Sequence, residues 1–161
     1  MHMVRLEQGD TVNDQISLEE VLGGIDESYR PFLKVATATL LRPCMPVVEA
    51  LWQAVRLVAP AIRFVQPVHV LLSRAPFEVP LSNGTLMFNP RPGVINVAME
   101  NIIFLDVLKI IQYPREIQIA TIVEEFVHAL MHVTDEELTS HIVALLYPGV
   151  RVVNGQYTVA T

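Results

Sequence analysis

The sequence has a single cysteine, few charges and no basic cluster, and each shortage argues against a class of protein. Cys44 alone cannot form an internal disulfide. Its one basic neighbour is Arg42, so we expect a buried or inert thiol, not a nucleophile. The 11 lysines and arginines are scattered, and the formal net charge is −6. Because phosphate contacts need concentrated positive charge, we expect no nucleic-acid partner.

Long apolar runs are also missing, although 52% of the residues are hydrophobic and the mean hydropathy is +0.40. A membrane-spanning helix needs about 18 consecutive apolar residues, and charges or prolines interrupt every run here before that length. The first ten residues lack the apolar core of a signal peptide. We therefore expect a soluble, cytoplasmic protein with no membrane partner. Its surplus apolar surface favours a homodimer, in which a second copy covers that surface.

Periodicity and turn residues predict a helical start and a strand-rich middle. Ser17 with Glu20 forms a capping-box pattern for a short helix, and residues 1–16 before it are expected to be loosely ordered. Helical spacing predicts two more helices, Pro31–Leu41 and Pro46–Val58. Three strands then follow, and together they predict a small mixed sheet: Ile62–Leu72 (an edge or bulged strand because of Pro67), Thr85–Phe88 after the turn at 82–84, and Gly93–Ala98.

The last third of the chain is predicted to be mainly helical. The expected elements are a core helix over Glu100–Ile111, a helix from Pro114 to about Met131, a helix capped by Thr134 that ends near Tyr147, and a hairpin around Asn154-Gly155. The overall prediction is one α+β domain over residues 1–161, with a small mixed sheet packed on helices.

Ionisable side chains concentrate in one stretch, Ile119–Pro148. It contains three of the five histidines and five acidic residues: His128, His132, His141, Glu124, Glu125, Asp135, Glu136 and Glu137. On a helix, Glu124, His128 and His132 lie at successive i and i+4 positions, so their side chains can converge on one cation. A short turn at 133–134 would let the next helix bring Glu137 and His141 to the same place. Opposed carboxylates and imidazoles are stabilised by a divalent ion between them.

The segments EEFVHALMH and DEELTSHIVALLYP resemble the HExxH helix and the following ligand helix of the zincin metallopeptidases, in particular the small gluzincin-like peptidases. The resemblance covers about thirty-five of the 161 residues. It implies a zincin-like fold with its site on two consecutive C-terminal helices. It further implies Glu125 as the general base, His128 and Glu137 as metal ligands, zinc as the metal, and a peptide or protein as substrate.

The sequence departs from that family pattern at Glu124, which stands where the first zinc-binding histidine is expected. Zinc accepts carboxylate oxygen, so Glu124, His128 and Glu137 still form a ligand set, with His132 or His141 as substitutes. A set with two carboxylates lowers the Lewis acidity of zinc and suits manganese or iron better than the usual set does. The resemblance therefore predicts a divergent or inactive metal-dependent peptidase, and in the latter case a pseudoenzyme.

Three other interpretations stay open from the sequence. If the HExxH motif is instead aligned on residues 128–132, His128 and His132 are its two histidines, but Ala129 then stands where the general base belongs. The segment Glu125-Phe126-Val127-His128 is the ExxH of di-iron bundles, yet no second such motif follows and the strands do not suit a bundle. The main alternative is a non-enzymatic interaction module whose acidic helix face binds no metal. A helix-turn-helix DNA reader is disfavoured because its second helix would begin with three acids.

Overall fold

A four-stranded mixed sheet forms the centre of the molecule. The computed structural model describes residues 14–74, 77–81, 83–89, 94 and 96–161. The sheet has the order β2 (Leu33–Thr37), β4 (Val68–Ser73), β8 (Ile102–Asp106) and β7 (Asn96–Met99). The first three strands are parallel and β7 runs antiparallel to β8. The predicted α+β class with a small mixed sheet is therefore confirmed.

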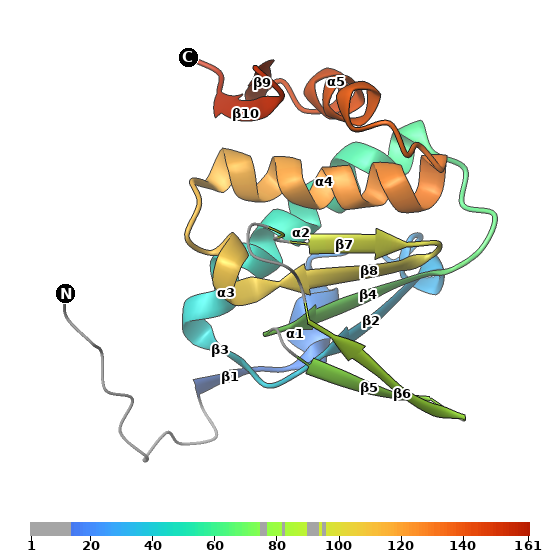
Figure 1. The fold of residues 1–161 in the computed structure, drawn as a ribbon. Coiled ribbons are helices and arrows are strands. Elements are labelled where there is room, and N and C mark those ends of the chain that lie inside the picture. Colours follow the sequence, from blue (N-terminus) through green and yellow to red (C-terminus); the bar gives the residue numbers. More distant parts are fainter. Residues whose placement is uncertain (1–13, 75–76, 82, 90–93, 95) are drawn as a thin grey trace.

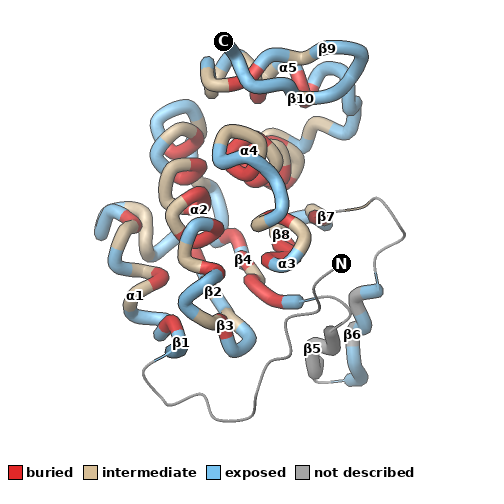
Figure 2. Tube along the Cα trace, turned by 90° about the vertical axis from the view of Figure 1, so that its left-hand side faces the viewer, coloured by how far each residue is buried: buried red, intermediate tan, exposed pale blue. Residues whose placement is uncertain are grey.

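Two long helices lie side by side over one face of this sheet (Figures 1 and 2). They are α2 (Met45–Val58) and α4 (Arg115–Met131), and both agree with the predicted helices to within one residue at each end. Their apolar residues and those of the sheet form one continuous core, which includes the buried Leu51, Val55, Leu72, Ile103 and Phe126. Burial of this apolar surface is the main contribution to the stability of the fold.

The α4 helix is packed on more sides than an amphipathic surface helix. It contacts α2, β7 and β8 on one side and α5 with the C-terminal hairpin on the other (Figure 1). The residues buried on it are Gln118, Ile119, Ala120, Ile122, Val123, Glu125, Phe126, Val127 and Ala129. Two polar residues, Gln118 and Glu125, belong to this buried set, so only part of the polar side of α4 contacts solvent.

The start of the described chain confirms the capping box. The helix α1 (Leu18–Gly23) begins where the Glu20 amide donates to Ser17 Oγ at 3.1 Å, and the Ser17 amide donates to Glu20 Oε2 at 2.9 Å. Just before it, β1 (Gln15–Ile16) pairs with β3 (Leu40–Leu41). The last two residues of the segment expected to be loose are therefore a strand, and residues 1–13 lie outside the described part.

Two predicted helices are wrong, and both segments form parallel strands instead. Within 31–41 only a 3₁₀ turn (Arg30–Phe32) is helical, and β2 follows it with all five residues paired to β4. Within 100–111, β8 occupies the centre of the sheet and only α3 (Val107–Ile110) is helical. Short apolar runs fit a buried strand or a buried helix equally well, and here pairing with β4 decides both.

The strand predictions of the middle segment hold in part. β4 is an internal strand, so the edge position inferred from Pro67 is wrong; the proline precedes the strand and takes no part in its hydrogen bonds. β6 (Gly84–Phe88) forms its own antiparallel hairpin with β5 (Phe77–Leu81) and does not join the main sheet. Ser82 of the predicted turn and Gly93 of the predicted third strand lie outside the described residues.

The C-terminal part covers α4 from above in Figure 1. It consists of α5 (Glu136–Leu146) and a hairpin of β9 (Val150–Val153) and β10 (Gln156–Val159). The predicted Asn154-Gly155 turn is confirmed: the φ angles of the two residues are 53° and 74°, the left-handed pair that a two-residue hairpin turn requires. The hairpin contacts both α4 and α5 and so fixes the position of the last helix.

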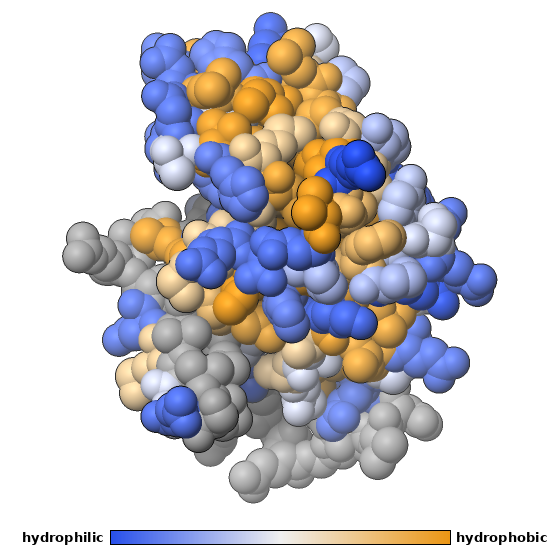
Figure 3. All heavy atoms as spheres, turned by 90° about the vertical axis from the view of Figure 1, so that its right-hand side faces the viewer, coloured by the Kyte–Doolittle hydropathy of each residue, from blue (hydrophilic) through white to orange (hydrophobic). Residues whose placement is uncertain are grey.

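None of the helices that the structure describes combines the length and apolarity needed to cross a bilayer. On the face shown in Figure 3, apolar side chains gather in the upper half of the molecule, where α5 and the C-terminal hairpin lie. The exposed large apolar residues of α5 and the C-terminal hairpin are Leu138, Leu145, Val153 and Val159. The homodimer expected from the composition stays a prediction.

Candidate metal centre

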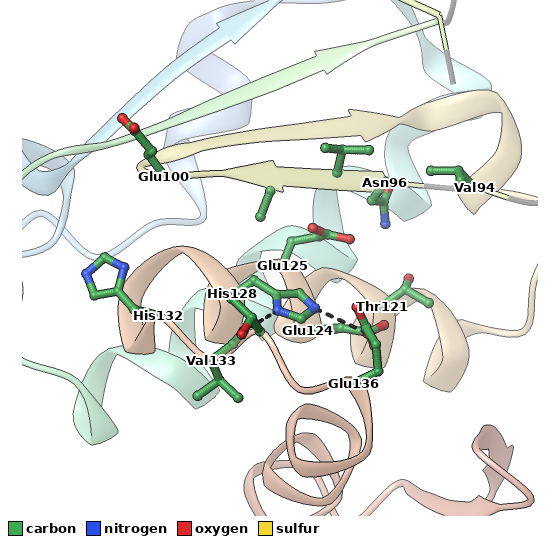
Figure 4. A pocket seen from close by; sticks show the side chains of 13 residues that line it. Val94, Asn96, Glu100, Thr121, Glu124, Glu125, His128, His132, Val133 and Glu136 are labelled. Carbon is green, nitrogen blue, oxygen red and sulfur yellow. Dashed lines mark hydrogen bonds and ion pairs between the residues drawn. The ribbon is translucent and has the colours of Figure 1, made fainter. Parts of the chain in front are cut away.

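A hollow lies between α4, β7 and the turn that joins α4 to α5 (Figure 4). Its volume is about 690 Å³, within the range of roughly 300–1,000 Å³ typical of sites for small ligands. The residues that line it are Val94, Asn96, Val97, Ala98, Glu100, Thr121, Glu124, Glu125, His128, His132, Val133, Thr134 and Glu136. Four carboxylates and two imidazoles therefore share one cavity.

The end of α4 sets the orientation of His128. The helix stops at His132, which adopts a left-handed conformation with φ 54° and turns the chain back. This turn brings the Val133 carbonyl oxygen to 2.6 Å from Nδ1 of His128. A carbonyl only accepts hydrogen bonds, so Nδ1 carries the proton and the neutral ring presents its lone pair at Nε2. A backbone carbonyl is one of the usual partners that orient a metal-binding histidine.

The start of α5 supplies the carboxylate opposite that nitrogen. Asp135 caps the helix by accepting the Leu138 amide at 2.8 Å, which makes Glu136 the first helical residue. Glu136 Oε2 lies 3.6 Å from His128 Nε2. The predicted cap at Thr134 is wrong by one residue, because Asp135 caps the helix.

Glu124 completes a group of three possible ligands. One atom from each of Glu124, His128 and Glu136 lies within 4.8 Å of the other two, so the group could hold a metal ion. Glu124 precedes His128 by one turn of α4, and both are half-buried, whereas Glu136 is exposed at the mouth of the cavity. Two carboxylate oxygens and one imidazole nitrogen form a ligand set suited to zinc, manganese or iron.

Glu125, the neighbour of Glu124, faces a different direction. Its carboxylate is turned towards β7, while the Glu124 carboxylate lies on the side of Glu136 (Figure 4). Glu125 is only 8% exposed. Burial, reinforced by the negative charges of Glu124 and Glu136, raises its pKa from 4.5 to about 8. A cation held by the neighbouring carboxylates would counter this repulsion.

Glu124 experiences the same influences to a smaller extent. Burial and the charge of Glu136 raise its pKa, and His128 and Tyr157 act in the opposite direction. The Tyr157 hydroxyl, on β10, is buried and makes no hydrogen bond with the part of the chain that the structure describes, yet it lies near enough to favour the ionised form of Glu124. The negative charge of Glu124 in turn adds to the effect of burial in raising the pKa of Tyr157.

The remaining predicted site residues lie apart from this group. His132 lines the same cavity but is exposed and belongs to the helix end. Glu137 and His141 line a separate hollow of about 540 Å³ between α5 and the C-terminal hairpin, which also includes Glu136. There His141 Nδ1 lies 2.7 Å from the Glu137 carbonyl oxygen. Of the predicted set, the structure thus brings together Glu124 and His128 beside Glu125.

Two residues of the site were missed from the sequence. Glu136 was missed because the zincin resemblance assigned the ligand of the second helix to the next residue, Glu137. Asn96, at the start of β7, carries no motif and becomes visible only when the strand is placed over α4.

No family model, no curated protein and no solved structure matches this chain.

Proposed function

We propose that this chain is a zincin-like metalloprotein in which Glu124, His128 and Glu136 bind one divalent cation, and that its reaction is peptide hydrolysis. The observation that carries the proposal is the convergence of these three side chains with Nε2 of His128 left free by the Val133 contact. The order of elements also supports it, because a small sheet precedes two consecutive helices that carry the ligands, as the zincin resemblance requires.

The ligand set in this proposal differs from the one inferred from sequence at a single position. Glu136 replaces Glu137 as the carboxylate from the second helix, and Glu124 and His128 keep their roles. Zinc is the first candidate, with manganese and iron as alternatives because two of the three donors are carboxylates.

When bound, the cation would supply Lewis acidity to a water molecule and to a substrate carbonyl. Glu125 would then serve as the general base and accept the proton of that water at a carboxylate oxygen. Its burial supports this role, because the pKa of a buried carboxylate changes strongly with the charge beside it.

The metal site is tested by calorimetric titration of the EDTA-treated protein with Zn²⁺ and with Mn²⁺. Loss of a second-sphere partner costs about 10–100-fold in metal affinity, so removal of a ligand by Glu136→Gln should cost at least as much. Glu137→Gln is the matched control, since it changes the adjacent glutamate identically and should leave the affinity unchanged. His128→Gln and His132→Gln form a second pair of the same design.

The metal-site proposal fails if the wild-type protein binds neither metal, or if Glu137→Gln weakens metal binding while Glu136→Gln does not.

Hydrolysis is a separate question, measured by the release of fluorescent peptides from labelled casein at saturating zinc. Glu125→Gln should abolish that release and leave zinc affinity within a few-fold. Zinc binding without any cleavage by the wild type would leave a metal-binding pseudoenzyme.

One observation favours the non-enzymatic alternative. If His128 is doubly protonated, its Nε2–H faces the Glu136 carboxylate at 3.6 Å and forms an ion pair that closes the site without a metal. In that case the acidic helix face serves as an interaction surface. The two functions are separated by the same titration, because an imidazolium in that position excludes a cation.

A further inference from the structure

A buried amide group faces the cavity from the side opposite the three ligands. Asn96 is the first residue of β7 and is 8% exposed. Its side-chain nitrogen is buried and makes no hydrogen bond with any of the described residues. In Figure 4 this nitrogen points from β7 towards α4, into the cavity that the metal ligands also line.

The orientation of the amide is determined by the backbone. The Asp106 amide N–H donates to Oδ1 of Asn96 at 3.3 Å. The reversed orientation would set the NH₂ group against that N–H, donor against donor, so the oxygen stays on β8 and the nitrogen stays on the cavity side. A buried donor that the protein leaves unpaired is costly, which is a reason to expect a ligand acceptor opposite it.

The surroundings restrict what that acceptor can be. Glu100, Glu124, Glu125 and Glu136 line the same cavity, so an anionic group facing Asn96 would be repelled. Val94, Val97 and Ala98 supply an apolar wall beside it. The chemistry that fits is an uncharged carbonyl oxygen with small apolar neighbours, as in the backbone of a capped peptide.

We propose that Asn96 Nδ2 is the donor that binds a carbonyl oxygen of an uncharged amide ligand in this cavity. Only the identification of that ligand as a substrate rests on the proposed function. The donor itself belongs to β7 and does not depend on the metal. Asn96 would thus hold the ligand from the sheet side while the metal ligands approach from α4 and α5.

The test is a titration of the full-length protein with N-acetyl-Ala-Ala-Ala-amide, followed through the side-chain amide signals in ¹⁵N–¹H spectra. It is done first in EDTA and then with Zn²⁺. We expect the Asn96 signals to move with the probe. The affinity should fall about tenfold in Asn96→Asp, which keeps the acceptor for Asp106 and removes the donor.

Asn101→Asp is the matched control, because it adds the same charge on the same hairpin. The Asn101 side chain donates to the Pro67 carbonyl at 3.0 Å and does not line the cavity, so the probe should bind this variant as tightly as wild type. The proposal is overturned if the Asn96 signals stay fixed in both conditions, if they respond to Glu125→Gln but not to the probe, or if Asn96→Asp binds as well as wild type.

The wild-type spectra show whether the probe binds at Asn96 even if Asn96→Asp does not fold. The two proposals fail separately, since loss of metal binding leaves the titration in EDTA unaffected. Conversely, a probe that does not bind at Asn96 overturns only this proposal, because the zinc affinities of the ligand variants are measured independently.

Discussion

Asp135 accepts the backbone amide of Leu138 at 2.8 Å, and this hydrogen bond caps α5 at its first residue, Glu136. The cap makes Glu136 the first residue of the helix, where it meets His128. The next residue, Glu137, lines a hollow on the side of the C-terminal hairpin. The candidate metal centre therefore takes one of its three possible ligands from the first residue of α5.

We predict that Asp135→Ala lowers the free energy of unfolding by about 1 kcal/mol, the usual effect of losing a helix N-cap. Urea denaturation of the EDTA-treated protein measures this. Thr134→Ala removes the cap inferred from sequence and should change stability by only a few tenths of that amount. Equal losses in the two variants would contradict the cap assignment.

The raised pKa of Glu125 predicts that the metal-free protein becomes less stable as the pH rises. Its pKa is about 8 in the folded protein against an ordinary 4.5, so between these values the folded state retains a proton that the unfolded state releases. The free energy of unfolding then falls as the pH rises through this window, with a slope of at most about 1.4 kcal/mol per pH unit from this group. Glu124, whose pKa is also raised, acts in the same direction.

Urea denaturation at pH 5, 6.5 and 8 in EDTA measures that slope. Glu125→Gln should flatten it and be more stable than wild type at pH 8, since the glutamine has no proton to lose. Glu137→Gln is the control and should keep the wild-type slope. A Glu125→Gln variant whose stability changes with pH as steeply as wild type would show that Glu125 titrates normally.

Local signals in the sequence were sufficient for the helices and turns that depend on neighbouring residues. The capping box at Ser17 and Glu20, the helix after Pro114 and the Asn154-Gly155 hairpin each rest on contacts within a few positions of the chain. Each was predicted correctly because its determining partners are close in sequence.

The errors arose where distant pairing decides the structure. Leu33–Thr37 has an apolar pattern that fits a helix, and it becomes a strand because it pairs with Val68–Ser73 across some thirty residues. Ile102–Leu105 is apolar because β8 is an internal strand, paired with β4 and β7, and its residues 103–105 are buried in the core. Neither partner is visible from the segment itself.

The candidate site was predictable on α4 and less so elsewhere. Glu124, Glu125 and His128 follow from helical spacing, since one helix carries all three. Glu136 was missed because the resemblance pointed to the adjacent residue, Glu137. The position of Asn96 in the site depends on the packing of β7 against α4, which no local sequence pattern predicts.

We predict that Tyr157→Phe weakens zinc binding about tenfold, the effect expected on losing a second-sphere partner of a metal ligand. The hydroxyl is buried beside Glu124 and is positioned to steady its ionised form. In the metal-free protein the same change should not reduce stability, because the hydroxyl has no full hydrogen bond to lose there. Calorimetry with Zn²⁺ and urea denaturation in EDTA measure the two effects.

Tyr113→Phe is the control for that change, since Tyr113 is exposed and does not line the cavity. It should leave both zinc affinity and stability at the wild-type values. Equal zinc affinity of Tyr157→Phe and wild type would remove Tyr157 from the description of the metal centre.

Close packing between α1 and α2 predicts opposite effects of two neighbouring substitutions. A Cβ on Gly24 would overlap the indole ring of Trp52, whose Nε1 donates to the Val21 carbonyl at 2.6 Å. Gly24→Ala should therefore cost about 1–3 kcal/mol of stability, as overpacking does. A Cβ on Gly23 meets nothing within 4 Å, and Gly23→Ala should stabilise the protein by about 0.5–1 kcal/mol. Thermal unfolding of the two variants checks the signs, and a stable Gly24→Ala would mean that Trp52 can move aside.

The most direct test of the zincin resemblance is Glu124→His, because Glu124 is the one residue that departs from the motif. The change would place an imidazole one turn before His128 and give two histidines and a glutamate, the donor set of zinc peptidases such as thermolysin. We expect zinc affinity to rise relative to manganese affinity, because replacing a carboxylate by an imidazole makes the set softer. The loss of one negative charge next to Glu125 should also lower the pKa of that group towards the value suited to a general base. Competition titration of Zn²⁺ against Mn²⁺ measures the preference, and labelled casein measures any gain in cleavage. If the preference does not shift towards zinc, residue 124 does not reach the cation, and Glu136 with His128 would have to bind it without help from that position.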